Sequence, residues 1–146
     1  MAKTPEPTAG QAGYSGKPLA TKLGVKPNFR LLQQGAPKNV LETIGELPEG
    51  AEWVGARAKE LDLALVFATR EADLAAGIAK LRPKLKPAGM IWACWPKQTS
   101  PLATELGEAT VRATGLAAGL VDVKICAVDH DWSGLKFVIR RADRPK

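Results

Sequence analysis

Long hydrophobic runs are missing from this chain of 146 residues. No apolar segment approaches the roughly 18 to 20 residues that a membrane-spanning helix needs, so we expect no association with a membrane. Residues 1–26 also lack the apolar stretch of a secretory signal peptide. These two absences predict a cytoplasmic protein.

Cysteine and histidine are scarce as well. The chain has two cysteines, Cys94 and Cys126, and a single histidine, His130. No second cysteine lies at C-x-x-C spacing and no histidine cluster is present, so neither a zinc site nor a disulfide framework is expected. The sequence points to no metal and identifies no cofactor.

The rest of the composition is that of a globular protein, with 45% hydrophobic and 25% charged residues. Apolar runs predict strands at 29–33, 52–54, 61–68, 90–95, 121–128 and 135–140. Helical spacing predicts a helix over 40–47, a second helix after an N-terminal cap at Thr69, and a third from Ser100 to a C-terminal cap at Gly115. We expect a single Rossmann-like three-layer α/β domain over 17–141, with a mostly parallel sheet and a C-terminal antiparallel hairpin.

The net charge of +6 is concentrated at the two ends of the chain. Residues 1–26 carry four lysines and one glutamate, and residues 140–146 carry four basic residues and one aspartate. We expect a flexible tail over 1–16 and a basic tail over 142–146. Such tails favour solubility, or weak and salt-sensitive contact with nucleic acid.

Ligands of open α/β sheets bind beyond the carboxyl ends of the strands. That rule selects three loops here, and each contains a cation: Lys38, Arg70 or Lys97. Ser100, which follows Lys97, lies at an expected helix start. Trp95, which precedes Lys97, is expected to form an aromatic platform with residues 132–134. These five residues, Lys38, Arg70, Trp95, Lys97 and Ser100, form the predicted site for a small anionic ligand.

No catalytic residue is predicted. His130 lies between Asp129 and Asp131, a pattern found in general-base chemistry but also typical of a hairpin turn. A thiol dyad of Cys94 with His130 would need an accessible thiol, whereas Cys94 lies within an apolar strand beside tryptophans.

Part of the sequence resembles the class I methyltransferases, over residues 27–140. The segment LKPAGMIW (85–92) is similar to the entry into their fifth strand, and the terminal hairpin is similar to their reversed last strand. The resemblance implies a Rossmann-like fold and S-adenosylmethionine as cofactor. The loop at 33–38 departs from the family because it has only one glycine, and no acid follows the second predicted strand.

A second resemblance covers most of the chain. It rests on GYSG (13–16), LGVKP (23–27), WPK (95–97), GLVDVKICAVD (119–129) and WSGLKF (132–137). These segments resemble an uncharacterised bacterial family, domain of unknown function 3052, which implies no activity.

Three functions therefore follow as hypotheses. The first is a non-catalytic binding module for a small anionic ligand or a protein partner. The alternatives are a methyltransferase-like protein with a degenerate cofactor loop, and a protein that associates with nucleic acid through its basic tails.

The cysteine positions give a first testable prediction. Because burial disfavours the reactive thiolate, we expect both thiols to be structural, unlinked and catalytically idle. Thiol titration should show slow labelling of the native protein and two free thiols after denaturation. Lys124 precedes Cys126 by two residues and is the nearby charge that could lower the pKa of its thiol. Fast labelling of Cys126 in the native protein, or a disulfide in the purified protein, would contradict the prediction.

Overall fold

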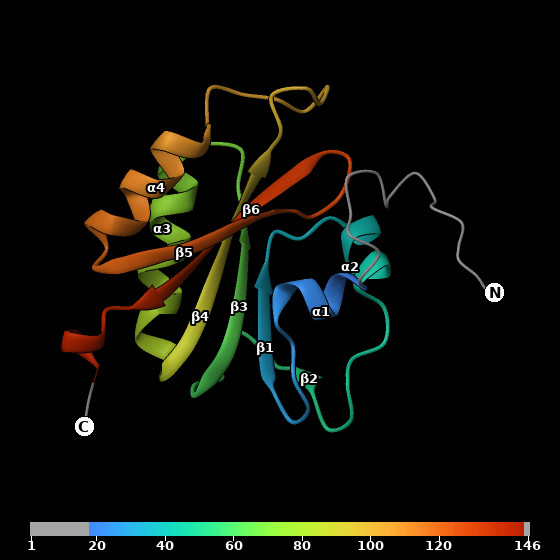
Figure 1. Ribbon diagram of the computed structural model, residues 1–146, viewed down its shortest axis with the longest axis vertical. Coiled ribbons are helices and arrows are strands. Elements are labelled where there is room, and N and C mark those ends of the chain that lie inside the picture. The colour runs from blue at the N-terminus through green and yellow to red at the C-terminus, as the bar shows by residue number, and fades with distance from the viewer. Residues whose placement is uncertain (1–17, 145–146) are drawn as a thin grey trace.

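Two strands in the middle of the chain, β3 (Leu61–Phe67) and β4 (Leu85–Pro96), are apolar on both faces and form the centre of one sheet. The computed structural model describes residues 18–144. The six strands have the order β2-β1-β3-β4-β6-β5 (Figure 1). The first four are parallel, and β6 runs antiparallel to both β4 and β5. The predicted fold class, a mostly parallel sheet with a terminal antiparallel pair, is confirmed.

The remaining strands and helices are β1 (Arg30–Gln34), β2 (Glu52–Trp53), β5 (Leu120–Ala127), β6 (Trp132–Ile139), α1 (Leu19–Leu23), α2 (Lys38–Ile44), α3 (Glu71–Leu81) and α4 (Glu108–Ala117), with two 3-10 helices, η2 (Arg82–Lys84) and η3 (Arg141–Asp143). None of the helices in residues 18–144 is long and apolar enough to cross a membrane. The whole of the predicted tail over 1–16, together with residue 17 and residues 145–146, lies outside the described part of the chain.

The sheet separates two apolar cores. Helices α3 and α4 cover one face, where Leu74, Ile78 and Val111 pack against strand residues such as Phe137. Helices α1 and α2 cover the other face. There the indole Nε1 of Trp92 donates a buried hydrogen bond of 2.9 Å to the backbone carbonyl of Leu23, which attaches α1 to β4. Helix α1 is not among the helices predicted from the sequence.

The predicted helix start at Ser100 is wrong. Residues 97–107 form turns, and α4 begins only at Glu108. The Ser100 hydroxyl accepts a hydrogen bond from the Leu102 N–H and donates one to the Asp131 carboxylate. Ser100 therefore belongs to a turn that its hydrogen bond to Asp131 attaches to the β5–β6 connection.

Two predicted helix caps are wrong as well. The N-cap position of α3 is Arg70 rather than Thr69, and it makes no side-chain cap. Gly115 lies inside α4, which ends at Ala117. A Cβ at Gly115 would lie 2.1 Å from Cε1 of Phe137, so glycine at this position lets the helix approach the sheet closely.

This contact gives the second prediction. Replacing Gly115 with alanine should lower the free energy of unfolding by about 1–3 kcal/mol, because the methyl group overpacks against the buried Phe137 ring. Chemical denaturation measures the change. In a Phe137→Leu background, which lacks the ring, the same substitution should cost less. A stabilisation of about 1 kcal/mol, the ordinary gain of alanine over glycine within a helix, would contradict this packing.

Candidate functional site

The carboxyl ends of β1 and β3 meet where the strand order reverses. The chain leaves β1 towards β2 on one side of the sheet, and it continues from β3 to β4 on the other side. Gly35 follows β1 with φ +78°, and a Cβ there would lie 2.7 Å from the Phe67 carbonyl oxygen. The loop therefore passes close to β3 before α2 begins, and such a reversal point is where open α/β sheets place ligands.

A hollow of about 540 Å³, the switch-point hollow, opens at this place. Its lining comes from the ends of β1, β3 and β6 and from α3: Gln34, Gly35, Phe67, Ala68, Thr69, Asp73, Ala76 and Trp132. The Phe67 and Trp132 rings form an edge-to-face pair with centroids 5.2 Å apart. The hollow thus combines an aromatic wall with the amide of Gln34, the hydroxyl of Thr69 and the carboxylate of Asp73.

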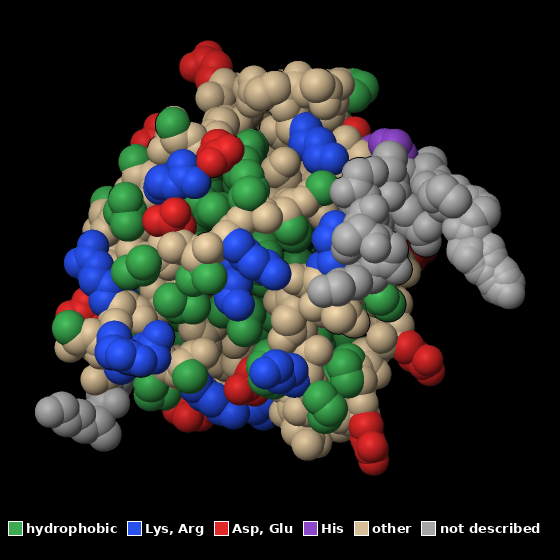
Figure 2. All heavy atoms as spheres, in the orientation of Figure 1, with side chains coloured by type: hydrophobic (Ala, Val, Ile, Leu, Met, Phe, Trp, Pro, Cys, Tyr) green, Lys and Arg blue, Asp and Glu red, His purple; other side chains and the backbone are tan. Residues whose placement is uncertain are grey.

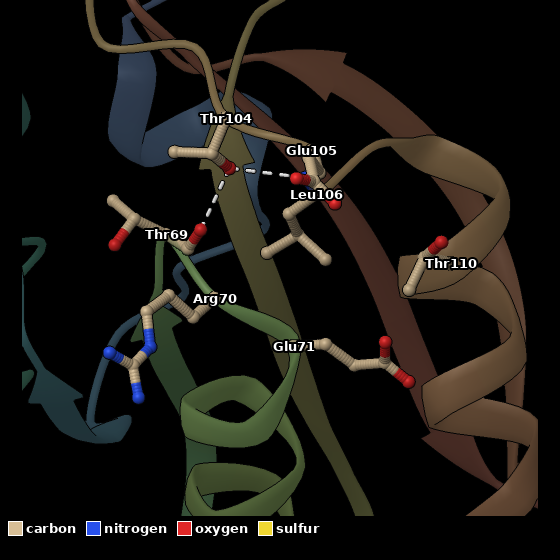
Figure 3. Close-up of a pocket in the computed structure, with 7 residues that line it drawn as sticks. All are labelled: Thr69, Arg70, Glu71, Thr104, Glu105, Leu106 and Thr110. Carbon is tan, nitrogen blue, oxygen red and sulfur yellow. Dashed lines mark hydrogen bonds between the residues drawn. The ribbon is translucent and has the colours of Figure 1, made fainter.

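A second hollow of about 370 Å³, the α3–α4 hollow, shares Thr69 with the first (Figure 3). The other lining residues are Arg70, Glu71, Thr104, Glu105, Leu106 and Thr110. The Thr104 hydroxyl donates a 2.7 Å hydrogen bond to the Thr69 carbonyl oxygen and accepts one of 3.1 Å from the Leu106 N–H. These two bonds fix the 97–107 segment to the end of β3.

Arg70 is the predicted site residue that lines the α3–α4 hollow. Figure 3 shows its guanidinium extending away from Glu71 and Thr110. Its Nε lies 3.6 Å from the Asp73 Oδ2 in an exposed ion pair, with 75% and 63% of the two side chains accessible. An exposed pair of this kind contributes little stability, so its displacement by a ligand costs little.

The other predicted site residues are spread along the same edge. Lys38 is the first residue of α2, and Lys97 follows β4, where its N–H donates to the Asp131 carbonyl oxygen at 2.8 Å. Trp95 and Ser100 are both buried. Trp95 belongs to the core under α3 and α4, whereas Trp132 belongs to the core on the opposite face, so Trp132 pairs with Phe67 and not with Trp95.

Gln34, Phe67 and Asp73 line the switch-point hollow but are not among the five predicted site residues. Gln34 and Phe67 are the last residues of their strands, and both strands were predicted within one residue of their observed ends. The available signal was therefore the position at a strand end, not the charge of the side chain.

His130 is exposed at the turn between β5 and β6. The buried Asp129 carboxylate accepts hydrogen bonds from the backbone N–H groups of Asp131 (2.8 Å) and Trp132 (2.9 Å). This arrangement holds the hairpin turn. Within residues 18–144, no three His, Cys, Asp or Glu side chains are grouped to hold a metal ion.

Both cysteines are free thiols, and they differ in exposure. Cys94 is fully buried, and this burial raises the pKa of its thiol well above the ordinary value. Cys126 is half-buried. Burial raises the pKa of its thiol too, while Lys22, Lys124 and Lys97 act in the opposite direction.

The chain matches no known family model and no curated protein sequence. The resemblance to domain of unknown function 3052 therefore stays a prediction. Comparison with solved structures, in contrast, finds many with a similar fold.

Two of these are S-adenosylmethionine-dependent methyltransferases. A TehB-like enzyme from Corynebacterium glutamicum has a TM-score of 0.53 at 10% identity, with 88% of this chain and 91% of that chain covered. An enzyme from Aquifex aeolicus has a TM-score of 0.53 at 11% identity, with 82% and 86% covered.

A possible exported protein from Bordetella parapertussis has a TM-score of 0.60 at 11% identity. The match covers 83% of this chain and 65% of the length of the Bordetella protein. At such low identities the likeness concerns the fold alone. The structure and these comparisons together show that the chain has the Rossmann-like fold of the class I methyltransferases.

Proposed function

We propose that the chain is a non-catalytic binding module, and that its ligand is a small molecule with an anionic group. The observation that supports this most directly is the pair of hollows that meet at Thr69, next to Arg70, at the point where the strand order reverses. A concave site with an aromatic wall and a few polar groups is the usual form of a small-ligand site.

The charges around the hollows suggest how such a ligand would lie. Within residues 18–144, the Arg70 guanidinium forms one ion pair, the exposed one with Asp73, so an anionic group can replace that carboxylate. Lys38 at the start of α2 and Lys97 after β4 add positive charge along the same edge of the sheet, although neither lines a hollow. Glu71 and Glu105 line the α3–α4 hollow, where they suit hydrogen-bond donors of the same ligand.

The fold raises S-adenosylmethionine as an alternative ligand, but the residues fit it poorly. The loop after β1 has one glycine, which is used for the approach to Phe67. The segment after β2 begins Val54-Gly55-Ala56, so the position from which the family binds the ribose hydroxyls has no acid. We therefore derive no methyl-transfer step for this chain.

The third prediction tests the anion site. Phosphate or ADP should raise the melting temperature by several degrees, because a ligand at about 100 times its Kd stabilises by about 2.7 kcal/mol. Arg70→Ala should remove most of that rise. Lys80→Ala, which removes an exposed cation from the other end of α3, should leave it unchanged. No rise with either probe, or an equal rise in Arg70→Ala, would contradict the proposal.

The fourth prediction separates the module from the methyltransferase alternative. Without the ribose-binding acid, S-adenosylmethionine and S-adenosylhomocysteine should bind weakly, with Kd values of about 1 mM or more. Isothermal titration calorimetry measures both. Binding in the low micromolar range would overturn our proposal in favour of a methyltransferase-like protein.

A further inference from the structure

A second surface lies at the β5 edge of the sheet, away from β1 and β2. Strand β5 is the last strand of the sheet, so one of its edges has no partner strand among the described residues. Three of its apolar side chains are exposed: Val121 (36%), Val123 (51%) and Ile125 (46%). An edge of this kind presents unpaired backbone N–H and C=O groups to any extended chain that can pair with it.

Lysines surround this edge on the face that α1 leaves open. Lys124 of β5 and Lys136 of β6 are direct cross-strand partners, so their side chains share one face of the sheet. Like charges in directly opposite positions destabilise a strand pair. Lys22 reaches the same region from α1, since its Nζ donates a 3.1 Å hydrogen bond to the carbonyl oxygen of Ala127 at the end of β5.

Lys97 completes this cluster, which we call the lysine face: Lys22, Lys97, Lys124 and Lys136. Lys97, Lys124 and Lys136 form no ion pair within residues 18–144. Figure 2 shows Lys and Arg side chains across the middle of this side of the molecule, with most of the acidic side chains towards its periphery. Within residues 18–144, the charges of Lys97, Lys124 and Lys136 are therefore not paired with a carboxylate.

The lysines also influence one another. Partial burial lowers the pKa of Lys22, and the charges of Lys97 and Lys124 lower it further. Partial burial likewise lowers the pKa of Lys136, with additional contributions from Lys124 and Lys26. The repulsion among these ammonium groups would be relieved by an anionic partner placed between them.

We propose that an extended acidic segment of a protein partner adds as a further strand to the free edge of β5, with its carboxylates on the lysine face. Backbone pairing would supply affinity, and alternate side chains would supply specificity. Lys124 and Ile125 point to opposite faces of the sheet, as their partners Lys136 and Leu135 show. A segment that alternates acidic and apolar residues would place carboxylates near the lysines and apolar side chains near Ile125.

Two other occupants fit the observations less well. Single-stranded nucleic acid is usually bound with bases stacked on aromatic side chains, yet none of the exposed large hydrophobic residues of β5 is aromatic. A second copy of this chain would bring another β5 edge against the first. Lys124 is exposed on both copies, so the two cationic edges would repel each other.

The test uses a labelled peptide of eight residues, the length of β5, that alternates glutamate and valine. Fluorescence anisotropy should show binding to the full chain that weakens as salt rises. Lys124→Glu combined with Lys136→Glu should weaken it by about tenfold or more. The matched control, Lys59→Glu with Lys80→Glu, changes the net charge equally at exposed positions elsewhere and should bind like the unmodified chain.

Amide hydrogen exchange supplies the second readout. The peptide should slow exchange within residues 120–127, because strand addition protects the edge. The proposal is overturned if the control pair loses as much affinity as the test pair, or if exchange in β5 does not change. It is also overturned if the peptide does not bind. In that case, binding of an oligothymidylate of about 20 nucleotides through the same lysines would identify nucleic acid as the occupant. A dimer in light scattering, with β5 protected from exchange, would identify a second copy of the chain. None of these measurements involves Arg70, so failure here leaves the proposal for the carboxyl edge separately testable.

Discussion

The rest of the structure depends on the burial of β4 on both faces. Its side chains alternate between the two cores, with Ile91 and Ala93 under α3 and α4, and Trp92 and Cys94 on the side of α1. Parallel pairing with β3 and antiparallel pairing with β6 fix its register from both edges. The Trp92–Leu23 hydrogen bond then attaches α1 to this strand. One strand thus determines where the carboxyl edge lies and how far α1 extends over the sheet.

Much of the fold follows from local sequence patterns. The nearly continuous apolar run at 61–67 predicts a strand covered on both faces, and that is its place in the sheet. Pro87 and Gly89 suggested that the following strand starts later than it does. Leu85 already pairs with Leu61, and the register shifts before Leu63 pairs with Met90. Such an irregularity depends on the neighbouring strand, so it cannot be derived from β4 alone.

Less of the candidate site could be predicted. Strand ends and the reversal of strand order place it at the right edge. Its residues, however, were selected by charge, by an expected helix start at Ser100 and by an expected aromatic platform at Trp95, and none of these signals identifies the lining of the hollows. Arg70 lies at the hollows, while Lys97 lies near Lys22 and Cys126, because the turn after β4 is held by Asp131. The lysine face could not be predicted from the sequence for a similar reason. Lys124 and Lys136 become neighbours only through the β5–β6 register, which shifts between Asp122 and Lys124.

The central claim is that a small ligand binds at the carboxyl edge between β1 and β3. Amide resonances of the full chain, recorded by two-dimensional NMR during titration with ADP, test it most directly. The account predicts that the largest shifts occur at Gln34, Gly35, Thr69 and Arg70, the residues around the hollows. Shifts concentrated in β5 and β6 with none at the carboxyl edge, or no shifts with ADP or phosphate, would contradict it.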